Sequence, residues 1–392
     1  MGWAASNDTS GMIRGRSGWR RLAALTAAAA AWAVTGCGGS DAVKPSPLPQ
    51  LKPTVQARVA WRNSLGDSKR YVFTPALRAG AIYAAANDGS VARFDAANGK
   101  QVWRASSGER LSGGVGADAD QVLVGGEKGV VLAYSLDGKR LWRSDVTSEV
   151  LSAPRSAGGL VVVRSGDGHI AALDAATGQR RWEYQATLPP LLLRADGGVA
   201  VTRSAVLAGL PGGKLVALNL ETGAPIWDAM VAQPKGANEL ERITDIAAAP
   251  VVDGDHACAV TFQGRVACYE LAKGALLWSR DASSVVGLAA DQDTVFMVDE
   301  NSVVMAFDKA SGATVWKQDK LAARRLSAPA VVDSLVVVGD LEGYVHMLER
   351  DSGAFAARVP TDGSAISAQP LRIGGNVLVQ TRRGGLYAIS VK

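Results

Sequence analysis

The sequence predicts an all-β fold, an eight-bladed β-propeller with four-stranded antiparallel blades. Three observations predict it: a tryptophan repeat, a ladder of glycine-led strands, and two chain ends that complement each other. The first two recur roughly every 40 residues, a period typical of one small supersecondary unit used many times. The third observation decides whether the units close into a ring.

The tryptophan repeat includes seven of the chain's 10 tryptophans. All but the first stand four residues after a glycine, in segments such as FDAANGKQVW, LDAATGQRRW and FDKASGATVW. The set is Trp61, Trp103, Trp142, Trp182, Trp227, Trp278 and Trp316, and Trp61 has no such glycine. We interpret these tryptophans as structural residues between blades rather than as a displayed ligand site. Truncating a buried one to alanine is expected to cost roughly 3–5 kcal/mol.

The second ladder consists of short strands that precede the tryptophans. Each is aliphatic two residues after its start, and most carry alanine four residues after it. The starts are Gly89, Gly129, Gly168, Gly213, Gly264, Ser302, Gly343 and Gly384. Strands that are apolar on both faces and bounded by turn residues suit a sheet packed between two others. The alanines let neighbouring sheets approach, and the tryptophan fills the wider gap.

The two chain ends predict closure. The last repeat stops at Lys392 and lacks an outer strand, whereas residues 59–62 (Val-Ala-Trp-Arg) resemble such a strand without a blade. Pairing them completes the eighth blade and removes the edges that an open array would leave. An open solenoid would need polar capping repeats, and none is visible. We therefore expect one domain over residues 57–392, closed by its N- and C-terminal strands.

The first 36 residues predict a lipoprotein signal peptide. Four arginines precede an apolar run over residues 22–34, which is too short for a comfortable membrane span. The run ends in Val-Thr-Gly-Cys, which resembles a lipobox, so Cys37 is expected to become the acylated first residue. Gly38 replaces the aspartate of inner-membrane retention signals, which implies the periplasmic face of the outer membrane. The alternative is an ordinary signal peptide followed by a stray cysteine, and a true start at Met12 would change little.

Residues 37–56 are rich in Gly, Ser and Pro and predict a flexible tether. The segment before Cys37 carries four arginines and one aspartate, so most of the formal net charge of +5 belongs to it. No stripe of Lys and Arg interleaved with aromatic residues occurs, so we do not expect nucleic acid as a partner.

We expect no catalytic residue, metal or cofactor. His169, His256 and His346 fall in different blades without the spacing of metal ligands. The segment GLPGGKL, residues 209–215, is one residue short of a phosphate loop, lacks its Ser/Thr, and coincides with a repeat turn. No GxSxG motif is present.

Cys258 and Cys268 flank a tight turn and are expected on neighbouring strands of the fifth blade. A disulfide is one interpretation, because the periplasm is oxidising. The alternative is a pair of small buried residues, because Cys268 occupies a repeat alanine position.

The period fails at two places, where function is best sought. The stretches from Trp182 to Gly213 and from Trp227 to Gly264 are longer than their counterparts. Both should lie in consecutive connections from one blade's outer strand to the next blade's inner strand. Such connections emerge on one face of a propeller, so the two insertions should form one raised patch. Residues 235–245 of the second insertion are expected to form a short helix.

The content of the insertions predicts a protein-binding surface. Leucines beside charged residues are typical of a hot spot with a polar rim. The candidate residues are Leu191, Leu192, Leu193, Arg194, Glu241, Arg242 and Asp245. The alternative is that Leu191, Leu192 and Leu193 belong to the first strand of the fourth blade.

Repeats such as ALDAATGQRRW resemble the tryptophan-docking repeats of pyrroloquinoline-quinone (PQQ) dehydrogenases. Those enzymes are longer and carry insertions that build a cofactor chamber with calcium ligands and a catalytic aspartate. Nearly every connection here is short, and a shared packing motif does not carry function with it. A PQQ-dependent dehydrogenase-like enzyme is one alternative function, and a periplasmic propeller that binds unfolded clients or saccharide is another.

The lipobox, the tether, the eight blades and the two insertions together resemble the BamB family of outer-membrane protein assembly factors. The resemblance runs from Cys37 to Lys392, and the segments PPLLLR, ERITDI, FQGRVA and GDLEGYVH add to it. It implies a non-enzymatic scaffold of the β-barrel assembly machinery, the BAM complex, that docks on the periplasmic polypeptide-transport domains of BamA. It also implies that Leu191, Leu193, Arg194 and Asp245 form that contact. The family's second aspartate is Ala247 here, which weakens the acidic half of the assignment.

Overall fold

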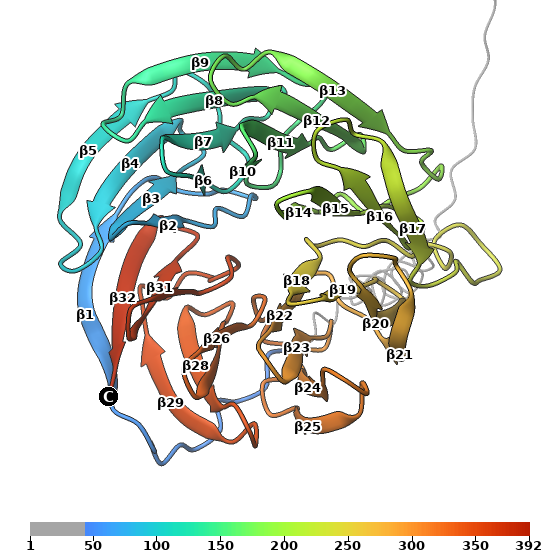
Figure 1. Ribbon diagram of the computed structural model, residues 1–392. Coiled ribbons are helices and arrows are strands. Elements are labelled where there is room, and N and C mark those ends of the chain that lie inside the picture. The colour runs from blue at the N-terminus through green and yellow to red at the C-terminus, as the bar shows by residue number, and fades with distance from the viewer. Residues whose placement is uncertain (1–43) are drawn as a thin grey trace, which may run out of the picture. The chain divides into compact units, whose positions relative to one another are not determined.

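The computed structural model describes residues 44–392, so the predicted signal peptide, Cys37 and the first part of the tether lie outside the described residues. Strands β1 to β32 form eight four-stranded antiparallel sheets arranged around a ring (Figure 1). The predicted eight-bladed propeller is confirmed. Within residues 44–392 no helix is long and apolar enough to cross a membrane.

The strands of each blade follow chain order from the central channel outwards. Blade one contains β2 (Ala76–Arg78), β3 (Ala81–Ala85), β4 (Ser90–Asp95) and β5 (Gln101–Ser106). Blade two contains β6 (Gly116–Ala117), β7 (Gln121–Gly125), β8 (Val130–Ser135) and β9 (Arg140–Asp145). Blade three contains β10 (Arg155–Ala157), β11 (Leu160–Arg164), β12 (His169–Asp174) and β13 (Arg180–Gln185). Blade four contains β14 (Val199–Val201), β15 (Ala205–Gly209), β16 (Lys214–Asn219) and β17 (Pro225–Met230).

The second half of the ring repeats this order. Blade five contains β18 (Val251–Asp253), β19 (His256–Val260), β20 (Gly264–Glu270) and β21 (Leu276–Ala282). Blade six contains β22 (Leu288–Ala290), β23 (Thr294–Val298), β24 (Val304–Asp308) and β25 (Thr314–Gln318). Blade seven contains β26 (Ala330–Val332), β27 (Leu335–Gly339), β28 (Tyr344–Glu349) and β29 (Phe355–Pro360). Blade eight contains β30 (Leu371–Ile373), β31 (Asn376–Gln380), β32 (Gly385–Val391) and, from the other end of the chain, β1 (Ala57–Ser64).

Blade eight closes the ring as the chain ends predicted. β1 pairs antiparallel with β32, so that Ala57 lies opposite Val391 and Ser64 lies opposite Gly385. Because the two strands come from opposite ends of the chain, the blade has no hairpin between its third and outer strands. The pairing covers the edge of β32 that would otherwise be open to another chain.

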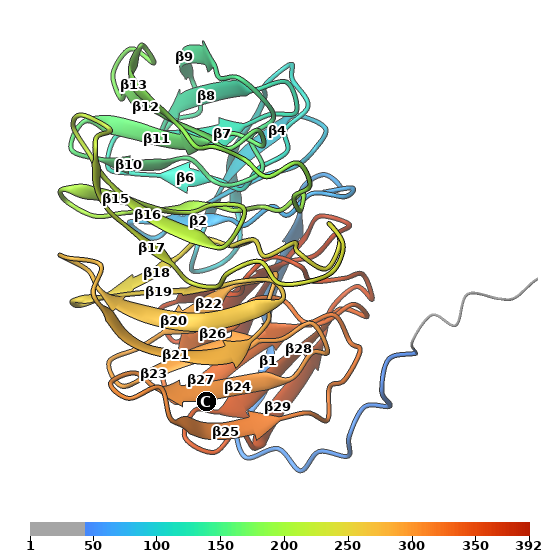
Figure 2. The ribbon, with the colours of Figure 1, turned by 90° about the vertical axis from the view of Figure 1, so that its right-hand side faces the viewer.

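The disc has two distinct faces. Antiparallel strands alternate in direction, so the connection from each blade's outer strand to the next blade lies on the same face as the turn between its second and third strands. We call this the link face. The remaining hairpin turns of each blade lie on the opposite side, which we call the hairpin face. Figure 2 shows the disc from its edge, with the two faces at either side.

Each repeat tryptophan docks on the following blade rather than on its own. The ring of Trp61 lies against Gly99, where an added Cβ would be 2.3 Å from a ring carbon. Gly99 also has a φ of +71°, which favours glycine. The same contact joins Trp103 to Gly138, Trp142 to Gly178, Trp182 to Gly223, Trp227 to Gly274, Trp278 to Gly312 and Trp316 to Gly353. Trp61 therefore has a glycine partner in space, although it has none before it in the sequence.

The indole nitrogens complete these contacts. Trp182 Nε1, for example, donates to the backbone oxygen of Leu220 in the next blade at 2.8 Å. The small residue of the strand ladder lies directly opposite the tryptophan of its own blade, as Ala172 does opposite Trp182. This arrangement confirms that alanine makes room for the tryptophan.

Blade seven has no repeat tryptophan, because the next blade is blade eight, which the N-terminal strand β1 completes. Blade eight has no hairpin after β32 and so no docking glycine, and Ala357 occupies the tryptophan position. Met347 lies opposite Ala357, so in this blade the large residue is on the third strand and the small residue is on the outer strand, the reverse of the other blades' usual order. Val55 and Ala57, from the amino-terminal end, pack against the apolar cluster that contains Ala357. The tether thus fills the place that a tryptophan fills elsewhere.

The two cysteines of blade five are joined. Cys258 on β19 and Cys268 on β20 lie directly opposite each other, with Cα atoms 4.1 Å apart, and form a disulfide. Both residues are buried. Cys268 also lies opposite Trp278 in the small position of the ladder.

Candidate partner-binding surface

The two insertions lie where the repeat analysis predicted. Residues 186–198 connect β13 to β14, and residues 231–250 connect β17 to β18. Both are connections between consecutive blades on the link face. We call residues 186–198 the first loop and residues 231–250 the second loop.

Asp245 holds the two loops together. Its Oδ2 accepts a hydrogen bond from the backbone N–H of Leu193 in the first loop at 2.6 Å. Its Oδ1 accepts from the backbone N–H of Gly212, in the turn between β15 and β16, at 2.8 Å. The side chain is only 3% exposed. Asp245 therefore lies beneath the surface and positions the loops, with both carboxylate oxygens already bonded within the chain.

The leucines of the first loop differ in exposure. Leu191 is 39% exposed, whereas Leu192 and Leu193 are half-buried. β14 begins only at Val199, so the alternative that these leucines form the first strand of blade four is wrong. Leu191 is therefore the apolar side chain that this loop displays.

Arg194 is held in place by residues of two other connections between blades, Glu149 before β10 and Tyr71 before β2. Its Nε donates to Glu149 Oε1 at 2.7 Å, and its Nη2 bonds to Oε2 of the same carboxylate. The guanidinium carbon lies 5.5 Å from the centre of the Tyr71 ring. The hydrogen bonds to Glu149 raise the pKa of Arg194 above its ordinary value. Sequence reasoning missed Tyr71 and Glu149, because nothing in the repeat marks them as neighbours of Arg194.

The second loop does not contain the expected helix. Only a single turn forms, in which the N–H of Arg242 donates to the Asn238 carbonyl at 3.2 Å. The Glu241 side chain instead accepts from the backbone N–H of Ala237 and from Asn238 Nδ2, each at 2.8 Å. These bonds accompany a turn over residues 239–242 that does not continue into a second turn. Gly236 also adopts a φ of +151°, which is outside the helical region.

Leu240 is the most exposed apolar residue of this surface. It is 68% exposed at the tip of the second loop. Glu241 and Arg242 are exposed beside it, with Arg242 Nε donating to the Gly236 carbonyl at 3.1 Å. The sequence analysis did not single out Leu240. Its signal in the sequence is an aliphatic residue between two charged neighbours, Glu239 and Glu241.

A cavity of about 240 Å³ lies between the loops and blade three. Leu192, Leu193, Arg164 and Asp245 are among its lining residues. The guanidinium of Arg164 lies against Gly197, where an added Cβ would be 1.9 Å from Nη1, and Nη1 bonds to no acceptor among the described residues. Burial lowers the pKa of Arg164 to about 10, although the charge of Asp245 acts in the opposite direction. The cavity therefore presents a desolvated cation directly beneath the leucines.

A second cavity, of about 570 Å³, is the mouth of the central channel on the link face. All eight connections between blades contribute to it, and Arg155 and Asp196 stand on the side of the two loops. Burial raises the pKa of Asp196 to about 6, against the opposing charge of Arg194. The Asp196 side chain is exposed to solvent at the mouth of the channel. Many protein atoms nevertheless surround its carboxylate, and they disfavour the charged form.

The histidines have structural neighbours. His169 Nδ1 lies 3.2 Å from Asp167 Oδ1, His256 Nδ1 lies 2.6 Å from Asp255 Oδ1, and His346 is buried against Asp340. Within residues 44–392 no group of His, Cys, Asp and Glu side chains is placed to hold a metal ion.

The fold is that of an eight-bladed β-propeller built from tryptophan-docking repeats, with two irregular loops on its link face. The family model described as outer membrane protein assembly factor BamB matches residues 87–318 and 300–392. The outer membrane protein assembly factor BamB of Burkholderia pseudomallei (strain K96243) is 44% identical over 372 residues, which cover 94% of this chain and 98% of that protein. The chain belongs to the BamB family of assembly factors and is not an enzyme.

Solved structures support the same conclusion. The crystal structure of BamB from Moraxella catarrhalis matches with a TM-score of 0.79 at 25% identity, covering 86% of this chain and 100% of that one. The quinohemoprotein alcohol dehydrogenase ADHIIG from Pseudomonas putida HK5 matches with a TM-score of 0.69 at 16% identity, covering 88% of this chain and 78% of that one. At that identity the dehydrogenase shares the fold alone.

Proposed function

We propose that this chain is a lipid-anchored scaffold on the periplasmic face of the outer membrane. It binds the periplasmic polypeptide-transport domains of BamA, within the BAM complex, and assists the folding and insertion of outer-membrane β-barrel proteins. Membership of the BamB family supports the assembly role. Acylation of Cys37 lies outside the described residues and is supported by the lipobox.

The observation that carries the proposal is the bond between the loops at Asp245. A carboxylate that accepts from both Leu193 and Gly212 makes two flexible insertions into one preorganised surface. Preorganisation lowers the entropic cost of association. Leu191 and Leu240 are the apolar contacts of that surface, and Arg194, Glu241 and Arg242 form its charged rim.

The chemistry of the surface describes its partner. The exposed leucines favour an apolar patch on the partner. The cavity beneath them has Arg164 and Asp245 in its lining, so it favours a polar group of the partner. Leu192 and Leu193 line that cavity and shield it from solvent.

The proposal is tested by changing Leu191, Leu193 and Arg194 together to alanine. Co-purification of BamA from detergent-solubilised membranes should be abolished, because loss of a single interface anchor commonly costs about 2 kcal/mol or more. A matched control is Leu77→Ala with Arg78→Ala, an exposed Leu–Arg pair on β2 away from the loops. Wild-type recovery of BamA by the folded triple variant would contradict the mapping of the surface.

A further inference from the structure

The described part of the tether is bound along the outside of blade seven. We call residues 45–56 the strap. It leaves β1 at Ala57, which pairs with Val391 and so lies on the hairpin face. It ends at residues 45 and 46, beside residues 320–324 of the connection from β25 to β26, on the link face. In Figure 2 the strap, in blue, runs below the blades to the right-hand side of the disc.

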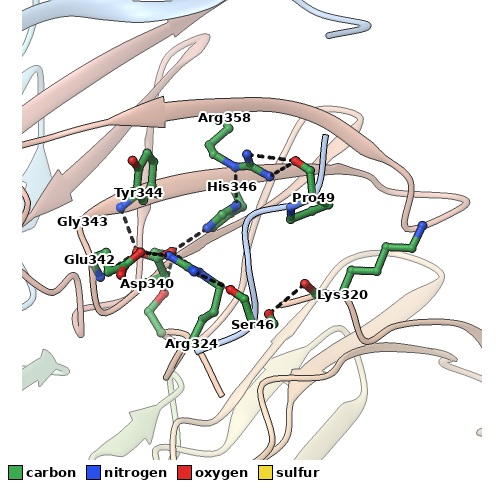
Figure 3. A network of polar contacts seen from close by, with 12 residues as sticks. Ser46, Pro49, Lys320, Arg324, Asp340, Glu342, Gly343, Tyr344, His346 and Arg358 are labelled. Atoms are coloured by element: carbon green, nitrogen blue, oxygen red, sulfur yellow. Dashed lines mark hydrogen bonds and ion pairs between the residues drawn. The ribbon is translucent and has the colours of Figure 1, made fainter. Parts of the chain in front are cut away.

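The link-face end of the strap is held by Arg324. This guanidinium is 2% exposed, and its Nε donates to Asp340 Oδ2 at 2.8 Å. Its Nη2 bonds to Glu342, and its Nη1 donates to the backbone carbonyl of Ser46 at 2.9 Å (Figure 3). The strap is part of this network, because the Ser46 carbonyl is one of the three acceptors of the guanidinium.

Arg358 holds the strap at Pro49, three residues after Ser46. Its Nη1 and Nη2 both donate to the carbonyl of Pro49 at 3.2 Å, and its Nε donates to His346 Nδ1 at 3.2 Å (Figure 3). Because arginine only donates, His346 Nδ1 must accept, and the imidazole proton lies on Nε2. That nitrogen is 2.8 Å from Asp340 Oδ2. The histidine thus connects the two arginines through one buried carboxylate.

Backbone bonds complete the site. The N–H of Ser46 donates to the Ala322 carbonyl at 3.0 Å, and the N–H of Thr54 donates to the Ala356 carbonyl of β29 at 2.9 Å. Thr54 Oγ1 also donates to Glu349 Oε1 at 2.6 Å. The strap belongs to the same compact unit as the blades, which begins at Pro45. Prolines 45, 47, 49 and 53 restrict its backbone and present carbonyls without competing N–H groups.

The strap decides how far and from which face the anchor can reach. A chain leaving the disc at Ala57 would let Cys37 reach roughly 70 Å from the hairpin face. A chain leaving at Ser46 lets it reach roughly 30 Å, from the link face. The link face also carries Leu191 and Leu240.

We propose that Arg324, Arg358, Asp340 and His346 form a binding site on blade seven for the chain's own proline-rich strap, and that this site presents the link face to the membrane. The inference rests on the proposed lipid attachment at Cys37. The occupant is recognised by two main-chain carbonyls, so its extended backbone matters more than its side chains. The site is a positioning device: it places the two-loop surface on the side from which a membrane-embedded partner extends.

The first test measures strap binding in the full chain. Arg358→Ala removes both bonds to Pro49, and the amides of Ser46 and Thr54 should then exchange with deuterium at least tenfold faster. Arg358→Lys retains one donor and should have a smaller effect. Arg78→Ala, an exposed arginine on β2, is the matched control and should leave both amides unchanged. Unchanged exchange in a folded Arg358→Ala protein would overturn the assigned site.

The second test measures orientation. The lipidated chain is bound to vesicles of phosphatidylethanolamine and phosphatidylglycerol that contain an acceptor lipid. A donor dye is placed at Lys235→Cys on the link face or at Lys273→Cys on the hairpin face. Energy transfer should be stronger from position 235, and Arg358→Ala should abolish the difference. Equal transfer in the otherwise wild-type chain, or a difference that persists after the strap is released, would overturn the proposal.

The two tests separate the inference from the proposed function. A chain that floats with vesicles and co-purifies with BamA, but shows no preference between faces, overturns the orientation alone. A chain that fails to float with vesicles overturns the lipid anchor on which the orientation rests.

Discussion

Asp245 illustrates how a residue can serve a binding surface without touching a partner. Its carboxylate accepts backbone hydrogen bonds from Leu193 and Gly212 and is 3% exposed. The resemblance to the BamB family implied a direct contact for this position. Within this chain its oxygens are already engaged, so the role in binding that we propose for it passes through the geometry of the loops.

Changing Asp245 to alanine should therefore lower both stability and partner binding. Two partly buried N–H groups would lose their acceptor; a fully buried unsatisfied group costs about 1–3 kcal/mol, so each loss here should lie at the lower end of that range. Urea unfolding should show a lower midpoint, and less BamA should co-purify. Asp245→Asn keeps one carbonyl acceptor and should be intermediate. A Asp245→Ala protein as stable as wild type would contradict the assigned role.

His346 gives the fold a dependence on pH. Burial is the first cause that lowers its pKa below 6.5, the neighbouring Arg358 and Arg324 act in the same direction, and Asp340 opposes them. The unfolded chain therefore takes up a proton near pH 6.5 that the folded chain does not. The free energy of unfolding should fall as the pH drops below 6.5, by up to about 1.4 kcal/mol per pH unit, until the folded-state pKa is reached.

Urea unfolding at pH 7.5, 6.5 and 5.5 checks this dependence. His346→Gln removes the titrating group, and its stability should fall less steeply over the same range. Equal slopes in the two proteins would show that His346 does not titrate differently in the folded and unfolded states.

At the scale of the element, the docking of a tryptophan on a glycine is the repeated contact between blades. Gly178 has a φ of +74°, and a Cβ there would lie 2.6 Å from the Trp142 ring. Gly159 has a similar φ of +76° but nothing within 4 Å. An alanine at Gly159 would therefore add backbone strain alone, whereas an alanine at Gly178 would add the same strain and a steric clash with the Trp142 ring.

Gly178→Ala should destabilise the protein more than Gly159→Ala. Both should lose about 1–2 kcal/mol from the left-handed backbone, and only the first should lose a further 1–3 kcal/mol, roughly, from overpacking. The midpoints of urea unfolding give the comparison. Equal losses of stability in the two variants would show that the Trp142 ring moves aside without a cost in free energy.

The disulfide of blade five closes a short loop between two paired strands. Its cysteines are 10 residues apart, and cross-linking a loop of that length stabilises a fold by about 2–3 kcal/mol in the chain-entropy description. A thiol count on the denatured, unreduced, acylated protein should find no free thiol. Two free thiols would show that the cysteines remain reduced. Cys258→Ala with Cys268→Ala should unfold at a lower urea concentration than the oxidised protein.

At the scale of the molecule, closure and function use the same segment of chain. β1 completes blade eight, and the strap that precedes it fills the position where blade seven lacks a tryptophan. The strap then crosses to the link face, where the two loops join consecutive blades. The two loops and the Ser46 end of the strap therefore lie on the same face, while the regular repeats supply the frame.

The ring was predictable because its information is local and periodic. The spacing of Trp103, Trp142 and their equivalents, and the incomplete repeat at Lys392, are visible in any reading of the chain. The positions of the two loops followed, because each insertion falls between a repeat tryptophan and the next strand-start glycine. The expected helix in residues 235–245 was wrong: only one turn forms, and Gly236 before it adopts a non-helical φ of +151°.

The sequence by itself determined the number of blades, the closing strand and the two loops, because each depends on a pattern that repeats along the chain. Only the tertiary structure decided which loop residues face outwards. It paired Asp245 with Leu193, Arg194 with Glu149 and the strap with Arg324 and Arg358. These contacts join residues far apart in the chain, and their energy depends on burial and geometry that no local pattern contains.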